Sequence, residues 1–151
     1  MKKVENKVML ITYADSMGSN LIELESALEK YFRGAVKGIH ILPFFPSSGD
    51  RGFAVIEYDR VDPAFGNWSD IDRLAEKYTL AADFMLNHVS IRSAEFQDYM
   101  EKGDTSEFRD MFIHWSTFWP NGEPTEEEFN AMYLRRPGGP TKEFTRADGK
   151  V

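Results

Sequence analysis

Polar and aromatic side chains follow the ends of three apolar runs in the sequence. Residues 13–15 follow the first run, residues 43–53 the second and residues 87–88 the third. The carboxyl ends of parallel strands open on one face of an α/β domain, so these segments are predicted to converge. Hydrogen-bonding groups beside an aromatic ring suit the hydroxyls and the apolar face of a sugar. The converging side chains are Asp15, Asp50, Arg51, Phe53, Asn87 and His88.

Several of these residues also have a simpler interpretation. Asn87 and His88 are typical of a turn after a strand, and Asp50 follows a Ser-Ser-Gly stretch that itself favours a turn. Asp83 lies inside an apolar run, where burial of a carboxylate requires a partner. Three scattered histidines and the absence of cysteine give no metal-ligand spacing, so no metal and no other cofactor is predicted.

The elements that position these residues begin with a strand. Residues 8–13 are nearly all apolar, which is typical of a strand buried on both faces. Asn20, with Glu23 three residues later, predicts a helix that begins with a capping box and ends at Gly34. Residues 38–42 form the second predicted strand.

The later elements repeat this alternation. A long irregular segment, 43–67, precedes a helix that Ser69 is predicted to cap. A third strand is predicted over 80–86, with helices over 93–102 and 126–132. Buried strands that alternate with amphipathic helices indicate an α/β fold with a parallel sheet.

Two α/β architectures fit this order of elements. A doubly wound nucleotide-binding fold has a glycine-rich turn after its first strand, whereas residues 14–20 contain one glycine. A (β/α)₈ barrel places its site on long loops such as 43–67. A barrel typically needs about 250 residues, and this chain of 151 holds three βα units. It is therefore either a small open α/β protein or the front part of a longer one.

Composition limits the partners that this chain can have. A formal net charge of −7 disfavours a broad nucleic-acid surface. Residues 134–151 carry five basic and two acidic side chains, a local excess that suits a small anionic ligand. No apolar run is long enough to cross a bilayer, and the charged first residues do not resemble a secretion signal. With no cysteine, we predict a cytoplasmic protein that acts on small molecules, without nucleic-acid or membrane partners.

One stretch also carries a family resemblance. Residues 83–88, Asp-Phe-Met-Leu-Asn-His, resemble the first characteristic region of the α-amylase superfamily, glycoside hydrolase family 13. Residues 10–15, 40–53, 96–98 and 111–112 are similar to the sucrose phosphorylase branch of that family. The resemblance extends from about residue 7 to the end of the chain.

The resemblance implies a fold and an activity. Residues 1–112 would form the N-terminal part of a (β/α)₈ barrel, about three βα units, and residues 113–151 the start of an inserted B domain. The implied reaction transfers glucose, with retention, from sucrose or sucrose 6-phosphate to inorganic phosphate. Its products are α-glucose 1-phosphate and fructose or fructose 6-phosphate.

The resemblance also implies roles for individual residues. His88 would bind the glucosyl 6-hydroxyl, Asp50 the far side of that sugar, and Phe53 would line the same subsite. Tyr133 would reach the acceptor side. The resemblance also implies that Asp83 and Asn87, which lie in the same motif, would orient the residues that contact the sugar.

The donor is suggested by a pair of arginines. Leu134-Arg135-Arg136 is similar to the sucrose 6-phosphate phosphorylases, and an arginine fork matches a phosphate bidentately. A solvated basic loop is the simpler interpretation. A glucosylglycerate phosphorylase is the alternative enzyme, because a carboxylate would also suit Arg135.

Catalysis itself requires residues that the resemblance does not place here. Retaining transfer uses two carboxylates about 5 Å apart, and the family pattern puts these beyond Val151. We therefore predict that the chain is an N-terminal fragment with part of a glucose subsite and no catalytic residue. A non-catalytic, truncated α/β sugar-binding chain is the remaining alternative.

Overall fold

The computed structural model describes residues 6–132 and 141–151 of the chain. The chain divides into two compact units, Met1–Ala94 and Glu95–Val151, which are described separately. The predicted boundary between barrel and inserted domain, at residue 112, stays a prediction.

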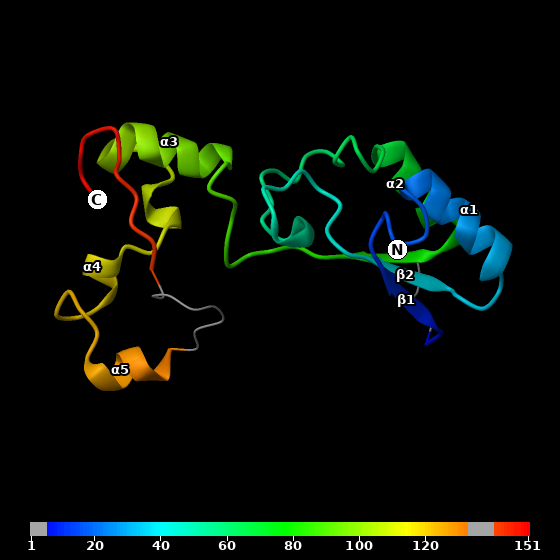
Figure 1. The fold of residues 1–151 in the computed structure, drawn as a ribbon, viewed down its shortest axis with the longest axis horizontal. Helices are drawn as coiled ribbons and strands as arrows, with labels where there is room; N and C mark the ends of the chain where they lie inside the picture. The colour runs from blue at the N-terminus through cyan, green and yellow to red at the C-terminus, as the bar shows by residue number, and fades with distance from the viewer. Residues whose placement is uncertain (1–5, 133–140) are drawn as a thin grey trace. The chain divides into compact units, whose positions relative to one another are not determined.

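The first unit is built on a parallel sheet of three strands (Figure 1). The strands β1 (Met9–Thr12), β2 (Gly38–Ile41) and β3 (Thr79–Ala82) pair in the order β1-β2-β3. Gly38 of the central strand lies opposite Met9 on one side and Thr79 on the other. Crossover helices join the successive strands, so the predicted α/β fold with a parallel sheet is confirmed.

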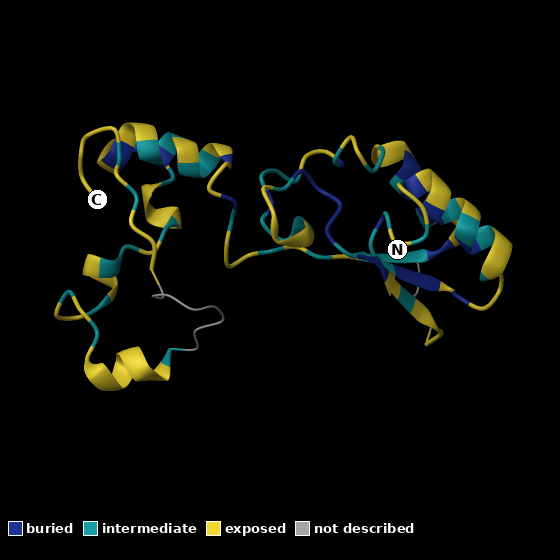
Figure 2. Cartoon of the chain, in the orientation of Figure 1, coloured by how far each residue is buried: buried dark blue, intermediate teal, exposed yellow. Residues whose placement is uncertain are grey.

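Helices α1 (Leu21–Tyr31) and α2 (Trp68–Lys77) cover one side of this sheet (Figure 1). Their inward faces pack against the central strand, and the outward faces are exposed (Figure 2). Leu21, Leu24 and Leu28 recur at helical spacing, and all three are fully buried with Ile39 of β2. Burial of each such side chain contributes about 1.5–3 kcal/mol of transfer free energy.

The helix starts differ in part from those predicted. Asn20 caps α1 by accepting from the Glu23 amide at 3.0 Å, but Glu23 closes no capping box, because its carboxylate accepts from the Ser19 amide at 2.6 Å. Helix α2 has a complete capping box formed by Asn67 and Asp70. Ser69 was therefore the wrong cap: its amide donates to Asn67 Oδ1 at 2.9 Å, which places it inside the helix.

The third strand is shorter than predicted. It ends at Ala82 instead of residue 86, and Phe84 and Leu86 beyond it are 63% and 86% exposed. Among the described residues β3 pairs with β2 alone, and β2 ends at Ile41. The continuing backbone bonds to a side chain instead: the Met85 amide donates to the Tyr58 hydroxyl at 2.9 Å.

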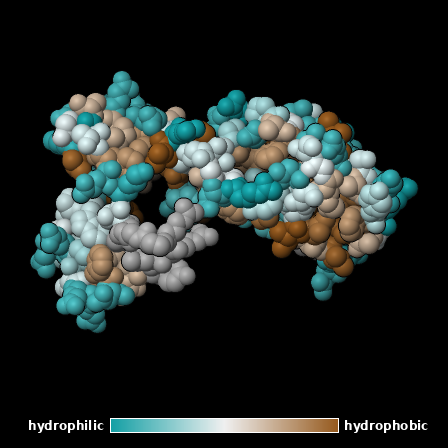
Figure 3. Space-filling model, viewed as in Figure 1, coloured by the Kyte–Doolittle hydropathy of each residue, from teal (hydrophilic) through white to brown (hydrophobic). Residues whose placement is uncertain are grey.

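The exposed apolar side chains of the sheet predict how the 151-residue polypeptide behaves when expressed by itself. Val8, Ile11 and Leu86 are more than half exposed, and Figure 3 shows apolar atoms gathered over β1. We expect aggregation or the absence of a cooperative thermal transition, because uncovered sheet faces and edges associate. Ile11→Lys should reduce aggregation measured by light scattering, whereas Ile22→Lys on the surface of α1 should not. A monomer with a sharp calorimetric transition would contradict this prediction.

A charged cluster joins the two helices. Glu25 of α1 accepts from Arg73 at 3.2 Å and from Lys77 at 2.9 Å, both on α2. The hydrogen bond from Lys77, opposed by partial burial and reinforced by Arg73, holds the pKa of Glu25 below its usual range. A carboxylate with a lowered folded-state pKa stabilises the fold above its unfolded pKa of about 4.3, and this contribution is lost as the pH falls through the folded value.

Glu25→Gln therefore has a pH-dependent effect on stability. The complete protein is the product of the complete reading frame. In it, we expect Glu25→Gln to lower the free energy of unfolding by about 1 kcal/mol at pH 7. This difference in unfolding free energy between variant and parent should disappear as the pH falls below about 4. Thermal midpoints measured from pH 3 to 7 test this, with Asp72→Asn as the control in α2. A gap that does not change with pH would contradict it.

In its described residues the second unit contains short helices and no strand, and it includes the basic segment near the end of the chain. It contains α3 (Ala94–Lys102), α4 (Trp115–Phe118) and α5 (Glu126–Ala131), with short 3₁₀ turns at Gly103–Thr105 and Arg109–Met111. The single turn α4 was not predicted. Among the described residues, no helix combines the length and apolar character needed to span a membrane.

The basic segment predicted to attract an anion is partly neutralised within this unit. Asp104 accepts from Arg146 at 2.7 Å and from Lys150 at 2.9 Å, which holds the pKa of Asp104 well below its usual range. The Arg146 side chain is only 8% exposed. Of the three basic residues of this segment that the structure describes, Arg146 and Lys150 are therefore engaged in internal ion pairs.

Candidate functional site

The loop after β2 has an unusual backbone at the point where the site is predicted. A bridge between Ser47 and Val55 closes it into a hairpin-like turn. At its tip, Asp50 and Arg51 have φ of 52° and 55°, the left-handed region that non-glycine residues rarely adopt. Gly52 follows with φ of 99°, and a Cβ there would lie 2.7 Å from the Pro43 carbonyl oxygen, so only glycine fits.

The tip of this loop is fixed to the segment after β1. The Arg51 guanidinium donates two hydrogen bonds to the carboxylate of Asp15, each 2.9 Å long. Its central carbon also lies 4.4 Å from the ring centroid of Tyr13. The hydrogen bond and charge of Asp15 raise the pKa of Arg51. Two of the three predicted loops therefore meet, as expected from the parallel sheet.

The third loop meets the same tip through His88. Its Nε2 lies 2.8 Å from the Phe53 carbonyl oxygen, and its Nδ1 lies 3.1 Å from Asn87 Oδ1. A carbonyl oxygen only accepts, so Nε2 carries the proton. In a neutral ring Nδ1 then accepts, which is satisfied when the Asn87 amide turns its NH₂ toward it. His88 and Asn87 are exposed beside the loop that holds Asp50 and Phe53.

Serine contacts that the sequence did not reveal join the second and third loops. The hydroxyls of Ser48 and Ser90 are 2.6 Å apart, and the Ser90 amide donates to the Val55 carbonyl at 2.9 Å. Ser90 is 2% exposed. A serine two residues after His88 gives no local signal of this role, because the contact depends on a partner 42 residues away.

Asp83 has the partner that its place in the chain requires. Its Oδ2 lies 3.0 Å from His40 Nε2, on the neighbouring strand β2. The side chains are 27% and 26% exposed, so the pair is half-buried. The contact of His40 with Asp83 was not predicted from the sequence. The support that Asp83 and Asn87 give to a sugar site stays a prediction.

Three predicted site residues, Tyr133, Arg135 and Arg136, lie outside the described residues. Of the other three, Asp50 is exposed at the loop tip, Phe53 is half-buried and His88 contacts the Phe53 backbone. Within the described part of the chain, no three His, Asp or Glu side chains are placed to hold a metal ion.

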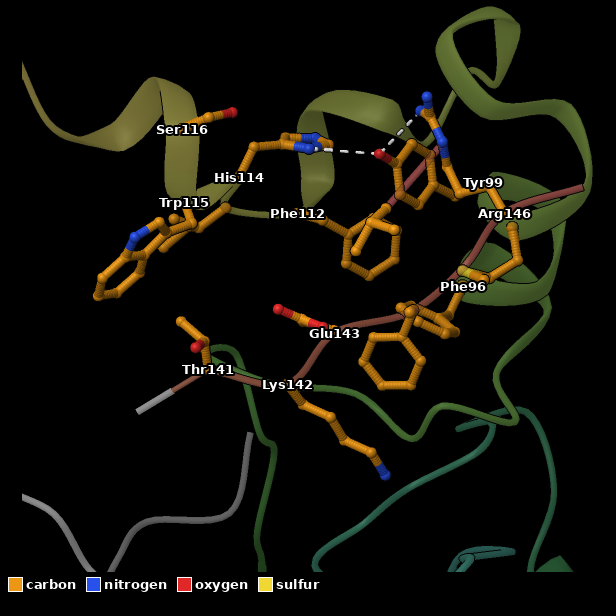
Figure 4. A pocket seen from close by; sticks show the side chains of 14 residues that line it. Phe96, Tyr99, Phe112, His114, Trp115, Ser116, Thr141, Lys142, Glu143 and Arg146 are labelled. Carbon is orange, nitrogen blue, oxygen red and sulfur yellow. Dashed lines mark hydrogen bonds between the residues drawn. The ribbon is translucent and has the colours of Figure 1, made fainter. Parts of the chain in front are cut away.

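The second unit contains an aromatic pocket of about 520 Å³. In Figure 4 the Tyr99 hydroxyl lies between His114 and the guanidinium of Arg146, at 3.3 Å and 3.1 Å. The second ring nitrogen of His114 contacts the Arg109 carbonyl at 3.2 Å, and Asp104 balances the charge of Arg146. The polar groups of Tyr99, His114 and Arg146 thus bond to one another or to neighbouring protein groups. This favours a structural role for these side chains over a role in ligand binding.

Parallel strands whose following loops join into one polar cluster are the arrangement found in (β/α)₈ enzymes. The family model described as "Alpha amylase, catalytic domain" matches residues 15–137. The chain therefore belongs to the α-amylase catalytic-domain family, and its three parallel strands are part of that barrel fold.

Within this family the chain is most informatively compared with two curated relatives. It is 53% identical to a sucrose phosphorylase of Streptococcus mutans, covering 97% of this chain and 30% of the relative. It is 52% identical to a sucrose 6(F)-phosphate phosphorylase of Thermoanaerobacterium thermosaccharolyticum, covering 88% of this chain and 27% of the relative. The chain thus spans about 30% of the length of the curated relatives that it matches.

Solved structures agree with this placement. The crystal structure of a sucrose 6F-phosphate phosphorylase from Thermoanaerobacter thermosaccharolyticum matches with a TM-score of 0.84 and 51% identity, over 90% of this chain and 28% of that one. An isomaltulose synthase from Erwinia rhapontici matches with a TM-score of 0.61 and 21% identity, over 71% and 21% of the two chains. The latter likeness shows the fold alone.

Proposed function

We propose that the complete protein is a disaccharide phosphorylase that transfers glucose from sucrose or sucrose 6-phosphate to inorganic phosphate with retention. The junction of His88 with the Asp50–Phe53 loop, 2.8 Å from Nε2 to the Phe53 carbonyl, carries this proposal. It brings the residues proposed to bind glucose to one place from two different strand ends. The reaction is proposed by analogy with the two relatives at 53% and 52% identity, a sucrose phosphorylase and a sucrose 6(F)-phosphate phosphorylase.

The described residues have a limited part in this reaction. Asp50 accepts hydrogen bonds from sugar hydroxyls, His88 contributes a ring nitrogen, and Phe53 packs against the apolar face of the ring. Retaining transfer needs a nucleophile and an acid/base about 5 Å apart, and the family resemblance assigns neither to this chain. These residues therefore bind and orient the glucosyl group, and the donor and phosphate are the small-molecule partners of a cytoplasmic enzyme.

The phosphorylated donor is the favoured one, because Arg135 and Arg136 offer guanidinium groups that match a phosphate. The alternative enzyme, a glucosylglycerate phosphorylase, draws its support from a relative in Spirochaeta thermophila. That relative is 44% identical over 109 residues, covering 70% of this chain and 18% of the relative. Both sucrose-acting relatives match more of the chain at higher identity.

The proposal is tested by phosphorolysis with the complete protein. Sucrose, sucrose 6-phosphate and glucosylglycerate are each supplied with inorganic phosphate, and glucose 1-phosphate is measured. We expect product from one or both sucrose donors, with the α configuration retained. Product from glucosylglycerate alone would favour the alternative enzyme, and no product from any donor would favour the non-catalytic reading.

A further inference from the structure

We propose that Asp15 is a positioning residue that acts through Arg51 to hold Asp50 in the orientation that binds the donor sugar. The inference rests on the proposed function for the role of Asp50. Asp15 follows β1 and Arg51 lies in the loop after β2, so the contact ties this loop to the sheet at a second point.

The loop needs such a restraint because its backbone is strained. Asp50 and Arg51 are consecutive left-handed residues, each costing about 1 kcal/mol or more relative to ordinary backbone. The backbone bonds of the turn leave the side chain of Arg51 to make the contact with the sheet: the Gly52 and Ala54 amides donate to the Gly49 carbonyl at 3.2 Å, and the Phe53 amide donates to the Asp50 carbonyl at 3.1 Å. Strained backbone persists only where surrounding contacts hold it.

The contact between Asp15 and Arg51 has the geometry of a clamp. Two parallel hydrogen bonds of 2.9 Å fix the plane of the guanidinium, and the Tyr13 ring lies 4.4 Å from its central carbon. The backbone around Asp15 is held in place on both sides. Ala14 is 2% exposed, and the Ser16 amide donates to the Tyr13 carbonyl at 3.3 Å. The contact therefore fixes the loop tip at Arg51 relative to the end of β1.

The solvent exposure of Arg51 and Asp15 indicates that their contact positions the loop and contributes little to the stability of the fold. The Arg51 side chain is 56% exposed and that of Asp15 is 26% exposed. Ion pairs of this kind contribute little to the free energy of unfolding. Loss of the clamp should then change the population of the loop conformation that presents Asp50, with little change in the thermal midpoint.

Asp15→Asn is the direct test, because it keeps the shape of the side chain and removes its charge and one of the two oxygens that accept from Arg51. If the binding-competent loop falls to about a tenth of its population, the apparent KM for the donor rises about tenfold. The kcat at saturating donor should stay within about twofold, because the bound complex selects the same loop conformation. Asp59→Asn, an exposed acid of the same long loop, is the matched control and should leave KM unchanged.

Arg51→Gln and the double variant complete the experiment in the complete protein. Since both residues act through one contact, the double variant should raise KM no further than either single variant. Amide exchange at Gly52 and Phe53 should accelerate in each variant. Additive effects on KM, an unchanged KM, or a loss of kcat that follows a loss of thermal stability would each overturn the inference. If the complete protein has no phosphorolysis, the proposed function fails, and amide exchange alone decides whether the clamp holds the loop.

Discussion

Asp50→Asn in the complete protein is expected to lower kcat/KM for the donor by about a hundredfold. A hydrogen bond to a charged group contributes about 1.5–3 kcal/mol, and each 1.36 kcal/mol is a factor of ten in rate. The substitution removes the charge of Asp50 and one of its two acceptor oxygens, and contacts to more than one hydroxyl raise the effect. Asparagine tolerates the left-handed backbone that Asp50 adopts, with φ of 52°, so the loop itself is retained.

The control for this variant is Asp59→Asn, an exposed acid in the same loop that should keep the parent activity. Steady-state kinetics over a range of donor concentrations give kcat and KM separately. A change below about threefold in kcat/KM for Asp50→Asn would show that Asp50 does not bind the sugar. In that case the residue would be an ordinary turn aspartate, which is the simpler interpretation that the sequence also allows.

The second large effect concerns the donor. Arg135→Ala is expected to lower kcat/KM for sucrose 6-phosphate by about a hundredfold and to leave sucrose within about threefold. A charge-assisted, bidentate arginine–phosphate contact is about twice as strong as a neutral hydrogen bond. Sucrose carries no phosphate, so the substitution removes no such contact from it. The measurement is the ratio of kcat/KM for the two donors, in the parent and in the variant.

Lys142→Ala is the matched control, because Lys142 is another basic residue of the same segment and lies 5.3 Å from the Phe144 ring centroid. If a general positive field attracted the donor, this variant would lose activity on the phosphorylated donor as Arg135→Ala does. We expect it to keep the donor ratio of the parent. Equal loss on both donors in Arg135→Ala would contradict specific recognition of the phosphate.

Much of the first unit could be predicted because its pattern is local. Leu21, Leu24 and Leu28 show helical spacing, and the apolar run over 8–13 contains the strand β1. The prediction that this strand is buried on both faces was wrong for the described structure, in which Met9 and Ile11 are exposed. The order of strands and helices then places the loops at the carboxyl ends of the parallel strands. This topology brings the segments that contain Arg51 and Asp15 together. Periodicity and chain order together contain this information.

Other features could not be predicted because they depend on partners far apart in the sequence. The end of β3 at Ala82 is set by the length of its neighbour, and the Tyr58 hydroxyl takes over the Met85 amide. The pairing of His40 with Asp83 joins residues 43 positions apart. The sequence also gives no sign of the left-handed backbone at Asp50, since aspartate occurs in ordinary turns as well.

The central claim is that the loops after β2 and β3 form part of a glucose subsite. A crystal structure of the complete protein with bound glucose tests it most directly. We expect the sugar beside Asp50 and His88, with the 6-hydroxyl within hydrogen-bonding distance of a His88 ring nitrogen and the Phe53 ring against the sugar. Both ring nitrogens of His88 are engaged here, Nε2 with the Phe53 carbonyl at 2.8 Å and Nδ1 with the Asn87 side chain at 3.1 Å, so the ligand must share or replace one of these contacts. Glucose bound elsewhere, with His88 still closed on Phe53, would contradict the account.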